Sequence, residues 1–529
     1  MIKKAFFLIV FSLVYCFSVA QVKDNYRSLL KDDGVKIDKT NLPIVFINVD
    51  GQMILRDDYI LAQMVIIHNG DGDYNYGDTI LHPNQHIDFK GYIALKYRGH
   101  TSFYNSDKKP YGFRTLKTSL LPVEGGEKKK VSLLGMAKDS QWAMLAPWVD
   151  RSMIRDILSF DLARPWMDFV PETRLCEVIL DGIYYGVYIL TERVSQGKNR
   201  LNLKDAEELN NGVETDILVY IDRGNDPYYE SRYHPYGIDG QNTDRYIKYE
   251  YKFPDNDDFS TLPEGTQNFV DSEINRMEES FLSANYDDPT NGYGKTIDIL
   301  SFIDYMLTTE VSYNVDGYRL STYMYKYSDK RALQEGLDNR WKLSLWDFNM
   351  AWGNTIYYDH TTFVGWNYDI NNRDDFQGDN DWVPFYWSKL LYDQEYVEKM
   401  QKRWKQYREG NYSIESIYSK IDSISNLITI CDAGKRNEKA WQIFNSDIWG
   451  VGYLVNTYEE EISYLKKWIK GRLAFMDEQQ SSNTTGMRNP YNGLASPCFY
   501  NLNGQQLVKK PKHGLYIKYD KGRAVIMSK

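Results

Sequence analysis

The sequence predicts an α+β fold with two lobes and a short β segment at its C-terminal end. Residues 42–260 contain β-branched and aromatic runs separated by Gly, Asn and Asp, a pattern typical of strands and turns. Residues 261–479 mostly carry apolar side chains at helical spacing. A stretch rich in Ser, Asn, Gly and Pro, residues 480–497, then separates residues 498–529 from the rest.

The composition is that of a globular protein with a large core. Of the 529 residues, 42% are hydrophobic and 15% are aromatic, which excludes a disordered or collagen-like chain. The formal charge of −10 gives no basic surface for a nucleic acid, so we expect no nucleic-acid partner.

Residues 1–20 have the pattern of a secretory signal peptide. Two lysines precede an apolar run that ends in Ser-Val-Ala, which predicts cleavage before Gln21. The alternative is lipoprotein cleavage at Cys16, but Tyr15 stands where such cleavage normally needs a small residue. We therefore expect an exported protein in the periplasm, at the cell surface or outside the cell. No other run is long and apolar enough for a transmembrane segment, and residues 21–41 lead into the first strand.

The cysteines do not form a recognisable framework. Signal cleavage would leave Cys176, Cys431 and Cys498, an odd number at wide spacing without a C-x-x-C pair. This pattern argues against a disulfide scaffold and against a zinc or redox motif.

The first half alternates strands with one long helix. Apolar residues at helical spacing predict a helix over 150–164, between strand-like runs on either side. The runs 174–182 and 184–192 are joined at Gly182 and predict a hairpin. The strand-like runs before the helix are 42–51, 59–70, 86–99 and 110–117.

The second half is predicted to be mostly helical around one β-hairpin. Helical periodicity marks residues 267–283 and 296–311, and most of 383–475. Between them, residues 318–327 and 340–348 are the two strand-like runs of the hairpin.

Charge also distinguishes the C-terminal segment. From Arg488 onward there are eight Lys or Arg and one Asp, whereas the chain as a whole is acidic. This supports a boundary near residue 485, with 480–497 as linker and 498–529 as a separate β segment.

Two patterns that resemble metal sites are better explained as loops. The sequence from Asp71 to Gly77 has alternating oxygen ligands, but Tyr76 and His82 stand where a calcium loop needs Gly and Glu. His82 and His86 have the spacing of zinc ligands on a helix, but the strand pattern here makes a helix unfavourable. No G-x-S-x-G elbow and no P-loop occurs in the chain.

Residues 311–354 carry the strongest candidate for catalysis. A predicted helix ends near Val311, and the following turn carries Asn314 and Asp316. The second strand of the hairpin ends in Asp347, which comes directly after Trp346. Phosphoryl-transfer enzymes use such an arrangement, with one carboxylate on Mg²⁺ and another that accepts the proton of the attacking hydroxyl. The alternative is that these side chains only cap turns and strand ends.

At these residues the sequence resembles the CotH kinase family of secreted or spore-coat atypical protein kinases. Five stretches occur in the order that this family has, which makes the resemblance specific. They are KYRGHTSFYNSDKKPYGFRT (96–115), LLGMAKDSQWAMLAPWVDRSMIRDILSFDLAR (133–164), RLCEVILDGIYYGVYILTERVSQGKNRLNL (174–203), NVDGYRLSTYMYK (314–326) and WDFNMAWGN (346–354).

The resemblance implies a two-lobed, kinase-like fold that binds ATP and Mg²⁺ or Mn²⁺ between its lobes. Its substrate would be an extracytoplasmic protein with a Ser or Thr acceptor. By this resemblance Asp316 is the catalytic base with Asn314 as its neighbour, and Asp347 and Asn349 hold the metal ion.

The resemblance also implies residues that bind the nucleotide. Lys109, or alternatively Lys108, would contact the phosphates from the N-terminal lobe, with Arg98 beside it. Glu192 would lie at a strand end near the adenine.

The sequence departs from the family pattern in three places. His100 stands where Asn is frequent, and Asn349 stands where an Asp is common. Tyr220 replaces a Glu that often stands two residues before the position of Asp222. These departures keep open a catalytically inactive CotH-like binding or adhesion protein.

Residues 498–529 resemble the sorting domains of the type IX secretion system. The resemblance lies in the pattern YNLNGQQLV, GLYI and GRAV, and implies secretion machinery as a partner. The alternative is a small β appendage that caps the second lobe.

Overall fold

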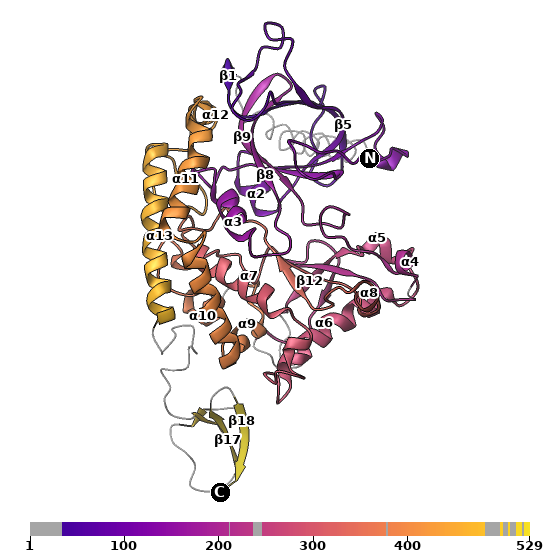
Figure 1. The fold of residues 1–529 in the computed structure, drawn as a ribbon, viewed down its shortest axis with the longest axis vertical. Coiled ribbons are helices and arrows are strands. Elements are labelled where there is room, and N and C mark those ends of the chain that lie inside the picture. Colours follow the sequence, from indigo (N-terminus) through magenta and orange to yellow (C-terminus); the bar gives the residue numbers. More distant parts are fainter. Residues whose placement is uncertain are drawn as a thin grey trace, which may run out of the picture.

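The computed structural model describes residues 34–210, 212–235, 246–376 and 379–481, and four strands between 498 and 528. Figure 1 shows a β-barrel at one end, a second sheet with helices on one side below it, and long helices along the opposite side. The predicted signal peptide and most of residues 480–497 lie outside the described residues.

The N-terminal part is a closed barrel of seven strands in the order β2-β3-β5-β6-β7-β9-β8. Every neighbouring pair is antiparallel except β2 and β8, which are parallel and close the barrel. The predicted hairpin at Gly182 is confirmed as β8–β9. The strands are β2 (Ile44–Asn48), β3 (Ile60–Ile67), β5 (Ile87–Tyr97), β6 (Tyr111–Thr115), β7 (Gln141–Leu145), β8 (Thr173–Leu180) and β9 (Ile183–Glu192), with a small pair β1 (Lys39–Thr40) and β4 (Asn75–Tyr76) beside them.

Alternation along the strands separates the inside of the barrel from its outside. Tyr97, Tyr111 and Phe113 belong to the apolar cluster that fills the barrel, and each is almost fully buried. Lys96 and Gly112 alternate with them and lie on the outward side. The outward side of β5 and β6 is therefore free to form one wall of a cleft.

The second sheet has five strands in the order β11-β12-β10-β13-β14. It joins strands that are about a hundred residues apart, because β10 pairs antiparallel with β13 as well as with β12. The predicted lobe boundary at residue 260 therefore divides this sheet. The strands are β10 (Ile217–Ile221), β11 (Tyr228–Glu230), β12 (Lys248–Phe253), β13 (Thr322–Lys326) and β14 (Lys342–Ser344).

The helices agree with the predicted periodicity. α3 (Arg155–Ala163), α6 (Thr266–Leu282) and α7 (Ile299–Ser312) match the three helices expected before residue 312. α7 begins where the Asp298 carboxylate accepts a hydrogen bond from the Ser301 amide, which caps the helix. The others are α2 (Thr101–Asn105), α4 (Ala206–Leu209), α5 (Asn256–Phe259), α8 (Asp329–Glu335), α9 (Phe385–Leu390), α10 (Gln394–Glu409), α11 (Ile414–Thr429), α12 (Ala433–Trp441) and α13 (Tyr458–Ser481).

These elements confirm the α+β class, while the closed barrel is a feature that the sequence did not predict. One continuous apolar cluster joins α3, α6, α7, the second sheet and the C-terminal helices. The described C-terminal strands form an antiparallel sheet in the order β16-β15-β17-β18: β15 (Cys498–Tyr500), β16 (Gln506–Leu507), β17 (Leu515–Asp520) and β18 (Arg523–Ser528). In the part of the chain that is described, no helix combines the length and apolar character needed to cross a membrane.

Candidate active site

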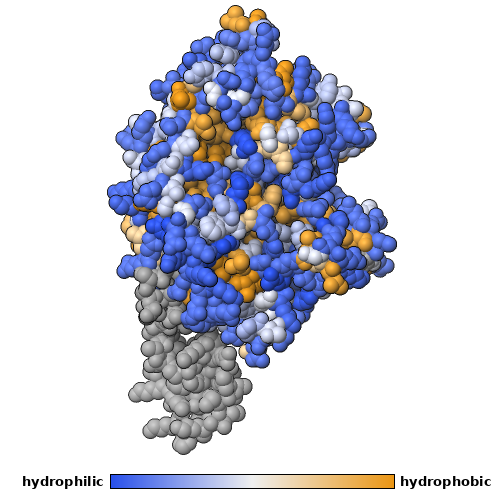
Figure 2. Space-filling view, in the orientation of Figure 1, coloured by the Kyte–Doolittle hydropathy of each residue, from blue (hydrophilic) through white to orange (hydrophobic). Residues whose placement is uncertain are grey.

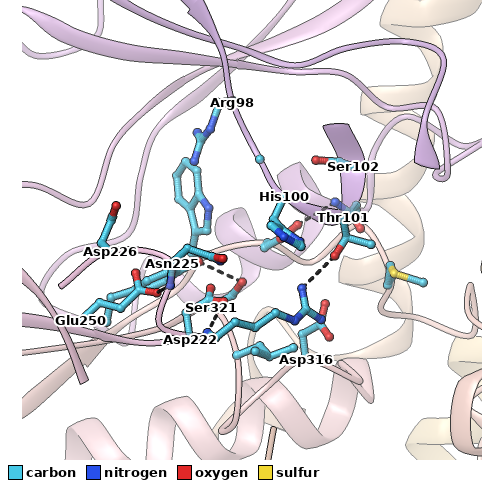
Figure 3. A pocket seen from close by; sticks show the side chains of 18 of the residues that line it. Arg98, His100, Thr101, Ser102, Asp222, Asn225, Asp226, Glu250, Asp316 and Ser321 are labelled. Atoms are coloured by element: carbon cyan, nitrogen blue, oxygen red, sulfur yellow. Dashed lines mark hydrogen bonds between the residues drawn. The ribbon is translucent and has the colours of Figure 1, made fainter. Parts of the chain in front are cut away.

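A cleft of about 760 Å³ lies between the outward side of the barrel and the second sheet. The space-filling view shows the surface hollowed between these two parts (Figure 2). One wall comes from the end of β5 and the loop after it, including Arg98 and His100. The opposite wall comes from the loops after β10, α7 and β14, which carry Asp222, Asp316 and Asp347. Figure 3 shows Arg98 across the cleft from Asp222 and Asp316.

The loop after α7 is held in a defined conformation. Tyr313 ends the helix with φ of 49°, which turns the chain sharply away from the helix axis. The Asn314 side chain accepts a hydrogen bond from the Asp316 amide and donates one to the carbonyl of Asp347, at 3.4 and 3.2 Å. Asn314 is buried and does not line the cleft. Its role in this structure is to join the two loops that carry the candidate carboxylates.

The loop after β14 presents Asp347 in a strained backbone conformation. Its φ of 61° is uncommon for a residue other than glycine, and such strain is often found at functional sites. The side-chain amide of Asn349 donates a hydrogen bond to Asp347 Oδ1 at 2.6 Å. The backbone amide of Phe348 donates one to Asp156 Oδ1, on α3, also at 2.6 Å. The fold therefore fixes both Asp347 and Asn349 at the cleft wall.

The carboxyl groups of Asp347 and Asp316 have raised pKa values, mainly because they are buried. Desolvation, and then the charges of Asp316 and Asp222, raise the pKa of Asp347 to about 7 although Arg98 opposes the shift. Desolvation also raises the pKa of Asp316, against the charges of Arg319 and Arg223. Both shifts arise mainly from burial. The lining shows the charge balance directly, because the carboxylates of this wall outnumber its cations: Asp222, Asp226, Glu250, Asp316 and Asp347 against Arg223, Lys252 and Arg319.

This surplus of carboxylates fits a bound divalent cation in charge and in ligand type. Asp347 and Asn349 offer only oxygen ligands, which Mg²⁺ and Mn²⁺ prefer. Across the described ranges, no three His, Cys, Asp or Glu side chains already converge as a metal site. The protein groups present could therefore supply part of a coordination shell, with phosphate oxygens and water completing it.

Tyr220 has a defined place beside this wall. Its hydroxyl donates a hydrogen bond to Ser321 Oγ at 3.1 Å, and Ser321 in turn interacts with the Asp347 carboxyl. In the sheet, Tyr220 pairs directly with Glu250 of β12, which also lines the cleft. A carboxylate therefore lies next to the position at which the family pattern often has Glu.

One arginine connects the two walls of the cleft. Arg223 Nη1 donates to Thr101 Oγ1 in α2 at 2.8 Å, and its Nε donates to Asp381 Oδ2 at 3.1 Å. Figure 3 shows this contact from Thr101 towards the opposite wall. The hydrogen bond holds the loop after β5 over the cleft.

Lys108 and Lys109, predicted to contact phosphate, do not line the cleft. The Lys108 ammonium is buried and donates to the Val187 carbonyl and to Asn437 Oδ1. The Lys109 ammonium is also buried and donates to the Phe103 carbonyl. Both ammonium groups are therefore engaged away from the cleft lining, and this structure does not place either of them at the predicted phosphate contact.

Glu192 also lies away from the cleft lining. Its side chain is buried and accepts a hydrogen bond from the Glu172 amide at 3.0 Å. Its other carboxylate oxygen faces Arg200 at 3.7 Å. The position therefore does not support the predicted contact with adenine.

The sequence interpretation gave no role to several cleft residues, among them Asp222, Arg193 and Arg223. Asp222 directly follows the buried strand β10, and this is the same signal that singled out Asp347. Nothing in the local pattern distinguishes the two arginines from other surface arginines.

The site is a cleft lined by carboxylates and arginines between the barrel and the second sheet. The family model described as CotH kinase protein matches residues 95–476, which is most of the chain and includes every cleft loop described above. The chain belongs to the CotH kinase family. Comparison with curated proteins found no match.

Proposed function

We propose that this protein is a kinase that transfers the γ-phosphoryl group of ATP to a Ser or Thr hydroxyl of a protein outside the cytoplasm. The observation that carries the proposal is that Asp316 and Asp347 come from separate loops to the same cleft, where Asn314 ties the loops together. Membership of the CotH kinase family supports it.

Asp347 and Asn349 would hold the divalent cation, Mg²⁺ or Mn²⁺. When bound, the cation neutralises charge on the phosphates and on the transferred phosphoryl group. The protein holds Asp347 ready through the amide of Asn349 and the loop contact from Asn314. Preorganised groups of this kind need little rearrangement during the reaction.

Asp316 would act as the general base. The acceptor oxygen forms a bond to the γ-phosphorus while the bond from that phosphorus to the β–γ bridging oxygen breaks, and the hydroxyl proton passes to the Asp316 carboxylate. The raised pKa of Asp316, caused mainly by desolvation, makes it a better proton acceptor. Arg319, whose Nη2 lies 3.7 Å from Asp316 Oδ1, would keep the carboxylate oriented.

Arg98 would contact the phosphates from the barrel wall. Its guanidinium stacks over the Trp346 ring, 4.7 Å from the ring centroid, which restricts its orientation. Trp346 directly precedes Asp347, so the same turn positions a cation on one wall and a carboxylate on the other.

The test is binding and transfer by the full-length exported chain. We expect ATP to bind only with Mg²⁺ or Mn²⁺ and radiolabelled γ-phosphate to appear on Ser or Thr of the protein itself or of a general acceptor protein. Asp316→Asn should keep binding but lose transfer. Absence of both metal-dependent ATP binding and transfer would overturn the proposal and favour an inactive CotH-like binding protein.

A further inference from the structure

Two arginines face the cleft from the barrel wall. Arg98 follows β5 and Arg193 follows β9, so they reach the cleft from strands that are not neighbours in the barrel. The positive charge of Arg193, after desolvation, lowers the pKa of Arg98, which places the two like charges close enough to repel each other.

Neither of these guanidinium groups forms a close ion pair among the described residues, although the more distant charge of Asp347 raises the pKa of Arg98. Arg98 Nη1 is buried without a hydrogen bond. Arg193 donates one hydrogen bond, to Gln141 Oε1 at 3.2 Å, and that acceptor is neutral. A buried or half-buried guanidinium without a counter-ion is costly, so such groups usually mark an anion-binding position.

Three other cations of the cleft are paired with carboxylates, whereas Lys96 contacts the Asp57 carbonyl at 3.4 Å and lies over the Tyr59 ring. Arg223 forms an ion pair with Asp381 at 3.1 Å. Arg319 forms one with Asp379 at 3.1 Å. Lys252 contacts the Glu250 carboxylate at 2.9 Å. Among the arginines that line the described cleft, Arg98 and Arg193 are therefore the two without an ion pair, since Arg56 also pairs, with Asp57 at 3.2 Å.

The opposite wall carries the surplus of carboxylates. A ligand that satisfies both walls must present several anionic oxygens to the arginines and a cation to Asp347 and Asn349. A metal-complexed diphosphate or triphosphate has both features, whereas a single carboxylate has too little charge for two guanidinium groups.

We infer that Arg98 and Arg193 together form a polyphosphate clamp, with Arg193 as a phosphate-binding residue in place of the lysine that the sequence suggested. This inference rests on the proposed function but names the part of the nucleotide that is recognised. Because the clamp contacts only the phosphate chain, it binds inorganic tripolyphosphate as well as ATP.

The experiment measures binding of magnesium tripolyphosphate and of magnesium ATP to the full chain by calorimetry. Arg193→Gln is expected to lower the affinity for both ligands by the same factor, about tenfold to a hundredfold, because one charge-assisted contact is lost. Arg193→Lys should recover part of the affinity, since it restores the charge without the bidentate geometry. The control is Arg174→Gln on β8, a half-buried arginine outside the cleft lining.

The outcomes separate this inference from the proposed function. If the wild-type chain binds magnesium ATP and Arg193→Gln, folded by circular dichroism, binds it within twofold, the clamp is wrong while the kinase proposal stands. If tripolyphosphate binds through Arg98 and Arg193 but no phosphoryl transfer occurs, the clamp stands and the kinase proposal falls. If the wild-type chain binds neither ligand, both fall.

Discussion

Replacing Asp347 by Asn should make the metal-free protein more stable while abolishing its response to Mg²⁺. The change removes the charge but keeps the shape, and Asn tolerates the positive φ of 61° at this position. It therefore isolates the electrostatic cost of holding an ionised carboxylate beside Asp316 and Asp222.

The size of the effect follows from the pKa of Asp347. Folding raises it from the ordinary 3.8 to about 7, so the folded chain keeps a proton that the unfolded chain has released. The free energy of unfolding due to this group is therefore highest below pH 4 and falls as pH rises to about 7. At about 1.4 kcal/mol per pKa unit, the loss reaches at most about 4 kcal/mol, and partial access to cleft water reduces it.

The assay is urea unfolding of both proteins with a chelator, at pH values from 4 to 8.5. The variant should match the wild-type chain at the acidic end and exceed it in unfolding free energy above pH 7. Added Mg²⁺ should stabilise only the wild-type chain, because binding to the folded state raises its unfolding free energy.

A matched control is available in Asp50→Asn. Asp50 is exposed and has φ of 52°, so it tests the same substitution in the same backbone conformation without the cleft. The reasoning is refuted if the difference in unfolding free energy between Asp347→Asn and wild type does not grow between pH 4 and 8, or if Asp347→Asn is no more stable than wild type at pH 8.

Three other substitutions test the assignments. Asp316→Asn should reduce phosphoryl transfer by about 10²–10⁴-fold with ATP affinity unchanged within a few-fold, measured in single-turnover assays; a large loss of affinity would argue against a base. Lys109→Ala should lower the unfolding free energy by about 1–3 kcal/mol, because the buried hydrogen bond to the Phe103 carbonyl is lost. ATP affinity should stay the same, and a selective loss of ATP affinity would support the predicted phosphate contact instead. Arg472→Met should lower the unfolding free energy in denaturant by about 3–5 kcal/mol, because the buried Glu310 carboxylate loses its counter-ion and the Glu310 carbonyl loses a donor. An unchanged unfolding free energy would show that these contacts do not stabilise the fold.

The local sequence pattern was sufficient to predict most individual helices and strands. Helical periodicity located α6 and α7 within a few residues of their observed ends, and Gly182 marked the β8–β9 hairpin. α3 begins later than predicted, at Arg155, because the preceding residues form a turn in which Met153 has a positive φ. Side-chain periodicity reports which face is apolar, but it does not report where a capping turn ends.

Asp316 and Asp347 line one cleft, as the sequence indicated, and each lies within four residues of the end of a helix or strand. The contacts of Lys109 could not be predicted from the sequence. Its place in the chain allows its side chain to lie on either side of the barrel wall, and only the folded structure shows that its ammonium is buried against the Phe103 carbonyl.

The sequence by itself determined the α+β class, the order of the elements and the two loops that carry the candidate carboxylates, because these depend on residues close together in the chain. Only the tertiary structure decided that the barrel closes through β2 and β8, whose paired residues lie over a hundred positions apart. It also decided which cations find close partners. Lys108 donates a hydrogen bond to Asn437, which is 329 positions away, while Arg98 and Arg193 face the cleft without a close ion pair among the described residues. Whether a charge is neutralised depends on distance and dielectric surroundings in space, and neither is encoded in local sequence periodicity.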